Sequence, residues 1–89
     1  MIILKNAAAG TLESSDAYVT VAPEKVLTVE IESVVMAQYG DAIRACVEQT
    51  LAELGVTEGH ITVKDKGAVE CVIAARVETA VKRGGGDAV

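Results

Sequence analysis

The sequence predicts an α+β fold in which a small antiparallel sheet, a three-strand meander plus a fourth strand, is covered by two helices. Two patterns indicate this class. Residues 26–33 alternate apolar and polar side chains, as in a strand that is buried on one face. Residues 34–54 repeat apolar side chains every three or four positions, as in an amphipathic helix. The chain has 89 residues, so we expect a single domain over residues 1–83.

The first strand is expected at residues 5–13, where the pattern is weak because the segment is rich in Ala and Gly. The returning strand is expected at residues 17–22, where apolar residues alternate with Tyr and Thr. Between them, residues 13–16 have the Ser and Asp content of a four-residue turn. The sequence therefore predicts a hairpin tip from which Ser14 projects into solvent.

A turn at residues 23–25 leads into the third strand, and three strands joined by short turns favour a meander. The helix at residues 34–54 has a marked end, because Gly55 suits the left-handed cap position. Its start is less clearly marked. Gly40 either lets the helix pass close to the sheet, which we prefer, or marks the start with Asp41 as the cap.

A short fourth strand is predicted at residues 61–63, ended by Asp65-Lys66-Gly67. Residues 68–83 fit a helix, although residues 68–76 also fit a strand; the length of the pattern favours the helix. Arg76 would lie within its apolar stripe and would need a carboxylate or carbonyl partner, or reach the rim. The alternative is a role in gripping phosphates. Residues 84–89, which begin with three glycines, are predicted to be a flexible tail.

Composition excludes several classes of function. The net charge of −5 and the scattered Lys and Arg residues argue against binding of nucleic acid. Aromatic residues make up only 2% of the chain, so its core must consist of Val, Ile, Leu and Ala. No apolar run has the length of a membrane span, and no signal peptide is recognisable, so we expect a cytoplasmic protein.

Few side chains in the sequence suggest catalysis or metal binding. Cys46 and Cys71 lack metal-type spacing and are interpreted as small buried thiols. His60 is interpreted as exposed and without a function. No metal site and no catalytic residue is therefore predicted.

Ser14 is the residue that stands out. A hydroxyl without a nearby base is a poor nucleophile, but at a hairpin tip it is accessible for modification. Ser15 is the competing hydroxyl. Glu13 and Asp16 are expected to be solvated turn carboxylates, and the alternative is that they guide a modifying enzyme or bind a cation.

Three motifs then carry a family resemblance. They are Gly10-Thr11-Leu12-Glu13-Ser14-Ser15-Asp16, then Tyr39-Gly40-Asp41-Ala42-Ile43-Arg44, then Asp65-Lys66-Gly67-Ala68 with Ala75-Arg76. Together, and in this order, they resemble the acyl carrier protein of citrate lyase, its gamma subunit, from about residue 7 to residue 82. The signature of the helical carriers of fatty-acid synthesis, Asp-Ser-Leu at a helix start, is absent.

The resemblance implies a non-catalytic carrier. Its serine, here Ser14 rather than Ser15, would bear 2'-(5''-phosphoribosyl)-3'-dephospho-CoA through a phosphodiester, making the chain a phosphoprotein. The thiol of this covalent prosthetic group would hold acetyl and citryl thioesters during citrate fermentation. The implied partners are the alpha subunit, which exchanges acetyl for citrate, the beta subunit, which releases oxaloacetate, and the transferase (holo-carrier synthase) that attaches the arm.

Alternatives remain beside the citrate lyase carrier. The same role in a citramalate lyase would look identical, because the substrate is chosen by the other subunits. A malonate decarboxylase carrier uses a similar cofactor but matches the motifs less well. A different class is an unmodified, acidic protein-interaction domain.

Overall fold

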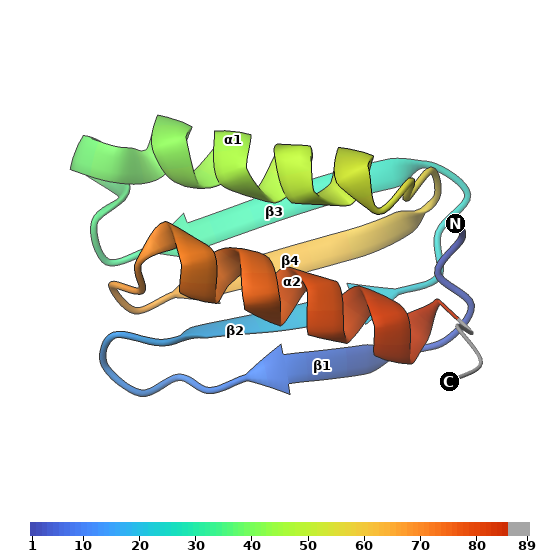
Figure 1. Cartoon of the computed structure of the whole chain (residues 1–89), viewed down its shortest axis with the longest axis horizontal. Helices are drawn as coiled ribbons and strands as arrows, with labels where there is room; N and C mark the ends of the chain where they lie inside the picture. The colour runs from blue at the N-terminus through green and yellow to red at the C-terminus, as the bar shows by residue number, and fades with distance from the viewer. Residues whose placement is uncertain (86–89) are drawn as a thin grey trace.

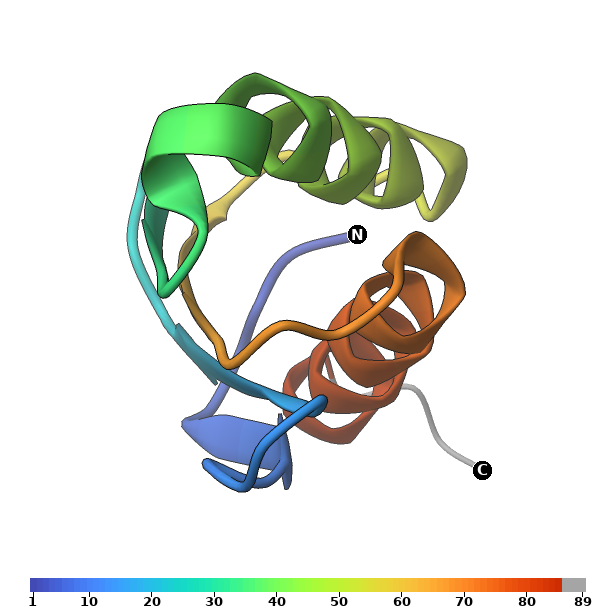
Figure 2. The ribbon, with the colours of Figure 1, turned by 90° about the vertical axis from the view of Figure 1, so that its left-hand side faces the viewer.

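The computed structural model describes residues 1–85, in which a four-stranded sheet carries both helices on one face (Figures 1 and 2). The α+β class and the two covering helices are therefore as predicted. The elements in chain order are β1 (Ala7–Gly10), β2 (Ala17–Ala22), β3 (Leu27–Ser33), α1 (Met36–Glu53), β4 (Gly59–Asp65) and α2 (Glu70–Gly84).

The strand order, β1-β2-β4-β3, differs from the predicted meander. β4 lies between β2 and β3, antiparallel to the first and parallel to the second, so the sheet is mixed rather than purely antiparallel. The four residues 23–26 join β2 to β3, which lie two strand spacings apart, about 10 Å. Four extended residues span about 13 Å. A short connection can therefore skip a strand, and it does not identify neighbouring strands.

The unit β3-α1-β4 explains the parallel pair, because two parallel strands need a long crossover connection, usually a helix. Helix α1 packs against β3, while α2 packs against β1 and β2 (Figure 1). The opposite face of the sheet carries no helix (Figure 2).

The bounds of the elements agree with the predictions to different degrees. β2 is found at the predicted residues, whereas β1 is shorter than residues 5–13, and β4 is longer than residues 61–63 and includes Asp65. The last segment is a helix rather than a strand. It continues through Gly84, one residue into the predicted tail, and the Gly84 carbonyl accepts the backbone N–H of Leu4 at 2.8 Å. Residues 86–89 of that tail lie outside the described residues.

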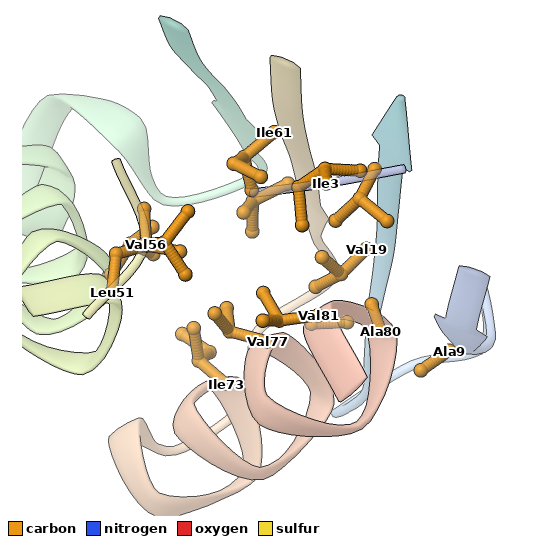
Figure 3. Packing of buried hydrophobic residues seen from close by; sticks show 14 of the residues in the cluster. Ile3, Ala9, Val19, Leu51, Val56, Ile61, Ile73, Val77, Ala80 and Val81 are labelled. Carbon is orange, nitrogen blue, oxygen red and sulfur yellow. The ribbon is translucent and has the colours of Figure 1, made fainter. Parts of the chain in front are cut away.

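The core fills the space between the sheet and the helices (Figure 3). As predicted, it is aliphatic. Its buried members are Ile3, Ala9, Ala17, Val19, Val21, Ile43, Val47, Leu51, Val56, Ile61, Val63, Ile73, Val77, Ala80 and Val81. Small side chains let the helices pack close to the sheet, which fits the low aromatic content.

Helix α1 ends as its sequence predicts. Gly55 has φ +72°, its N–H donates to the Ala52 carbonyl, and the Val56 N–H donates to the Leu51 carbonyl, which together form a Schellman cap. Gly40 is buried inside the helix, so it does not mark the start. A Cβ there would meet Met36 Sδ of the same helix at 3.0 Å, so close passage to the sheet is not what the structure indicates for Gly40.

Within the part of the chain that the structure describes, neither helix combines the length and the apolar character that a membrane span requires.

Candidate functional site

Three connections gather at one end of the sheet, around the predicted hairpin tip (Figures 1 and 2). They are the β1–β2 loop (residues 11–16), the β3–α1 connection (residues 34–35) and the β4–α2 connection (residues 66–69). Two backbone hydrogen bonds join the first to the last: the Ser15 N–H donates to the Lys66 carbonyl at 2.8 Å, and the Lys66 N–H donates to the Asp16 carbonyl at 2.9 Å. The tip is therefore fixed to the segment that leads into α2.

The predicted turn is present at residues 13–16. The Asp16 N–H donates to the Glu13 carbonyl at 3.1 Å, which closes the turn. Ser15, at the third position, has φ +67° and is the one non-glycine residue with positive φ among residues 1–85. Such a conformation costs a serine free energy and is retained only where surrounding contacts enforce it. Ser14, at the second position, is exposed as predicted.

The Asp16 carboxylate accepts the main side-chain hydrogen bonds of this loop. Asp16 receives two parallel hydrogen bonds from the Arg76 guanidinium, Nε to Oδ1 and Nη2 to Oδ2, each 3.0 Å. Thr11 Oγ1 donates to Asp16 Oδ2 at 2.7 Å, and the Ala17 N–H donates to Oδ1 at 2.7 Å. Asp16 is therefore not a solvated turn carboxylate. It ties both ends of the loop to α2.

The electrostatics of this pair follow from its geometry. The hydrogen bonds from Arg76, then from Thr11 and the Ala17 N–H, hold the pKa of the Asp16 carboxyl far below its usual range. Asp16 in turn raises the pKa of Arg76. The expectation that Arg76 needs a carboxylate or carbonyl partner is confirmed, and the partner is a carboxylate. Asp16 occupies the pair of guanidinium N–H donors that a phosphate would use.

Gly10 makes this arrangement sterically possible. Its φ is +92°, and a Cβ at this position would lie 1.9 Å from the Ala17 carbonyl oxygen and 3.0 Å from Arg76 Cδ. Glycine is therefore required where β1 enters the loop. The two strands can approach here only because there is no side chain.

Asp65 joins the other two connections and is the buried charged residue of the described chain, with 1% of its surface exposed. Ser33 Oγ donates to Oδ2 at 2.7 Å, and the Ala68 N–H donates to Oδ1 at 2.9 Å. The carboxylate thus links the end of β3 to the approach to α2. Sequence reasoning interpreted Asp65 as a strand breaker, and its alternation with Ile61 and Val63 was the signal that it faces the core.

His60 differs from its prediction. It is half-buried rather than exposed, and lies on the helix-free face of the sheet, where its Nδ1 is 3.3 Å from Glu24 and its Nε2 contacts Glu30. These contacts give His60 polar partners, while the interpretation that it has no function stays a prediction. His60 lies at the start of β4, away from the end that carries Ser14, so it does not contribute to this site.

The cysteines are also less buried than predicted. Cys46 is partly buried, its Sγ lies 3.6 Å from the Glu70 carbonyl oxygen, and desolvation raises the pKa of its thiol. Cys71 is exposed. In residues 1–85, no three His, Cys, Asp or Glu side chains are placed to hold a metal ion.

The geometry therefore presents two exposed hydroxyls, those of Ser14 and Ser15, on an anchored loop. Within the described residues, Ser14 has no hydrogen-bonded base that could activate it, and the ordered contacts belong to its neighbours Ser15 and Asp16. Such a hydroxyl is suited to be a substrate for modification rather than a catalyst.

Comparison with known proteins shows that this chain is similar to acyl carrier proteins. Residues 4–84 match the family model described as malonate decarboxylase delta subunit. The chain is 56% identical to the citrate lyase acyl carrier protein of Albidiferax ferrireducens, over 98% of this chain and 91% of the relative. It is 57% identical to that of Pectobacterium carotovorum, over 93% and 88%, and 51% identical to that of Escherichia fergusonii, over 93% and 88%.

A solved structure has the same fold at much lower identity. A chain in the crystal structure of a Pseudomonas malonate decarboxylase hetero-tetramer in complex with malonate superimposes with a TM-score of 0.77 and 18% identity, over 93% of this chain and 91% of that chain. At this identity, the likeness establishes the fold.

Proposed function

Because the chain belongs to the family of citrate lyase acyl carrier proteins, we propose that it is a carrier whose Ser14 bears 2'-(5''-phosphoribosyl)-3'-dephospho-CoA through a phosphodiester. When bound, this group supplies a thiol that carries acyl groups as thioesters. The chain itself performs no bond-making step. Its residues hold the attachment point in place and keep it outside the body of the domain.

The observation that carries the proposal is the exposure of Ser14 at the second position of an anchored turn. The Ser15 backbone N–H and the Asp16 carboxylate are bonded to Lys66 and Arg76, which anchors the turn, and the side chains of Ser14 and Ser15 are both exposed. The resemblance of Glu13-Ser14 to the family motif selects Ser14 over Ser15. The group fits such a site, because a bulky substituent on an exposed turn hydroxyl displaces no packed side chain. Anchoring matters for a carrier, since a tethered acyl group reaches a partner's active site efficiently only when its origin is defined.

The carrier belongs to a multi-subunit assembly in this proposal. Its partners are the citrate lyase alpha subunit, which exchanges acetyl for citrate on the arm, and the beta subunit, which releases oxaloacetate. A dedicated transferase, the holo-carrier synthase, attaches the arm. We place the protein in the cytoplasm, where these partners and citrate would meet it.

A malonate decarboxylase carrier is the second candidate. The match to the malonate decarboxylase delta subunit model and the shared fold favour it. The relatives at 51–57% identity, all citrate lyase carriers, favour the first candidate. Incubation of the loaded carrier with purified alpha and beta subunits separates the two, because only the citrate lyase carrier would support the release of oxaloacetate from citrate. A citramalate lyase is distinguished by the substrate that the complex purified from the native source cleaves, because the substrate is chosen by the other subunits.

The intact mass of the protein from cells fermenting citrate tests attachment. We expect a mass increase equal to that of the phosphoribosyl-dephospho-CoA group, and peptide mapping across residues 10–25 should locate it on Ser14. Ser14→Ala should abolish the increase. Ser15→Gly is the matched control, because it removes the competing hydroxyl while glycine suits φ +67°. An unmodified Ser14 in such cells would instead favour the plain interaction domain.

A further inference from the structure

A cleft of about 350 Å³ opens between the N-terminal halves of the two helices and the β4–α2 connection. Most of its lining is aliphatic, and Tyr39 and Glu70 add a hydroxyl and a carboxylate. The lining residues are Val35, Tyr39, Ala42, Ile43, Gly67, Ala68, Val69, Glu70 and Ile73. An apolar cleft of this size with few polar groups has the character of a small-molecule site.

The cleft lies at the end of the domain that carries Ser14. Ser14 is followed by Ser15, whose N–H is bonded to the Lys66 carbonyl, and Lys66 is followed by Gly67 in the wall of the cleft. Two Cα–Cα steps of about 3.8 Å and one backbone hydrogen-bonded step of about 5.5 Å separate Ser14 from Gly67, so their Cα atoms lie at most about 13 Å apart. Figure 2 shows the β4–α2 connection running between the β1–β2 loop and the two helix starts.

We propose that this cleft holds the pantetheine end of the group attached to Ser14 while the arm is not engaged with a partner. This inference rests on the proposed function, since it requires a loaded Ser14. Pantetheine contains a gem-dimethyl group and methylene segments, which suit the walls formed by Ile43, Val69 and Ile73. Its two amides can be met by Tyr39 and Glu70 at the rim.

The net charge of the protein favours entry of the uncharged end of the arm into the cleft. The phosphate and ribose portion is anionic, and the chain has a net charge of −5, so that portion remains in solvent near Ser14. The pantetheine portion is uncharged. Because its attachment point, Ser14, lies about 13 Å or less from the cleft wall, the tether raises the effective concentration of the pantetheine at the cleft.

The experiment compares methyl NMR spectra of the apo and loaded protein, after intact mass has confirmed that Ser14 carries the group. We expect shifts at the methyls of Ile43 and Ile73, which lie in the buried part of the cleft, and none at Val26 or Leu4, which are exposed at the opposite end. Free pantetheine added to the apo protein should shift the same cleft methyls at high concentration.

Two variants make the result specific. Ala42→Leu fills the cleft from an exposed position of α1 and should abolish the shifts of Ile73, whereas Ala52→Leu, equally exposed on α1 but outside the cleft lining, should retain them. Identical spectra of the apo and loaded protein at Ile43 and Ile73 would overturn the inference. Shifts that persist in Ala42→Leu, or that arise only on addition of the alpha or beta subunit, would overturn it as well. If the mass of Ser14 is not increased, the proposed function itself fails.

Discussion

Arg76 on α2 grips Asp16 of the β1–β2 loop through two parallel hydrogen bonds of 3.0 Å, across 60 residues of sequence. The pair is the main side-chain link between the loop that presents Ser14 and the helix layer. Bidentate pairing fixes direction as well as distance. The position of Ser14 therefore depends on a residue far from it in the sequence.

Loss of this link should slow attachment of the arm. In Asp16→Asn the charge-assisted fork is lost, so the loop should become mobile and the kcat/KM of the attaching transferase should fall, by up to about 100-fold if Ser14 is misplaced by about 1 Å. The helix content by circular dichroism should be unchanged. Asp41→Asn removes an exposed carboxylate from α1 and is the control. Equal rates for the two variants would contradict the positioning role of Asp16.

The Asp16 carboxyl should also contribute to acid stability in a defined direction. Its pKa is lowered in the folded protein, mainly by Arg76, from about 3.9 in the unfolded chain. The unfolded state therefore takes up this proton first as the pH falls. The stabilisation is complete above about pH 5 and is lost progressively below it. Urea unfolding should show a larger difference in free energy of unfolding between the wild type and Asp16→Asn at pH 7 than at pH 2.5. A difference that grows on acidification would contradict this assignment.

Two glycines with similar φ angles allow a test of the close approach at the loop entrance. Gly10 has φ +92° and Gly67 has φ +91°, but an added Cβ meets the Ala17 carbonyl oxygen only at Gly10 and meets nothing within 4 Å at Gly67. Gly67→Ala should cost about 1 to 2 kcal/mol of backbone strain. Gly10→Ala should cost roughly 3 kcal/mol or more, because strain and overlap combine. Thermal unfolding of both variants measures the difference in stability. Equal losses of stability would mean that β1 and β2 can move apart to accommodate the added Cβ.

The two cysteines should react with iodoacetamide at different rates. Cys71 is exposed, while desolvation raises the pKa of Cys46 and so lowers its thiolate fraction at neutral pH. Mass spectrometry of the apo protein should therefore show labelling at Cys71 well before Cys46. Cys71→Ser should remove the fast phase. Fast labelling of Cys46 in that variant would show that helix α1 moves away from the start of α2.

Local patterns in the sequence were sufficient to predict the helices and strands, but not the order of the strands in the sheet. The alternation in residues 17–22 and the apolar stripe of α1 give both type and position, and Gly55 gives the end of the helix, because each depends on neighbours within a few residues. The place of β4 between β2 and β3 depends on pairing over long distances, which leaves no local signal. The predicted meander was wrong for that reason.

In the candidate site, too, the local sequence predicts some features and only the fold reveals the others. The exposure of Ser14 and the need of Arg76 for a partner follow from the turn residues and from the apolar stripe of α2. The three-dimensional structure was needed to show that the partner of Arg76 is Asp16. It was also needed to show that Asp65 binds Ser33 and Ala68. Sequence reasoning identified the residue that we propose is modified, but not the residues that hold it in place.

The central position of β4 has a consequence for synthesis on the ribosome. The β1–β2 pair and β3 emerge before β4, the strand that joins β2 to β3, so the nascent sheet stays incomplete until residues 59–65 have left the exit tunnel. Arg76 emerges later still. The serine-bearing loop thus acquires its final shape only when nearly the whole chain has been translated, and a truncated or stalled product would offer a modifying enzyme an unanchored serine.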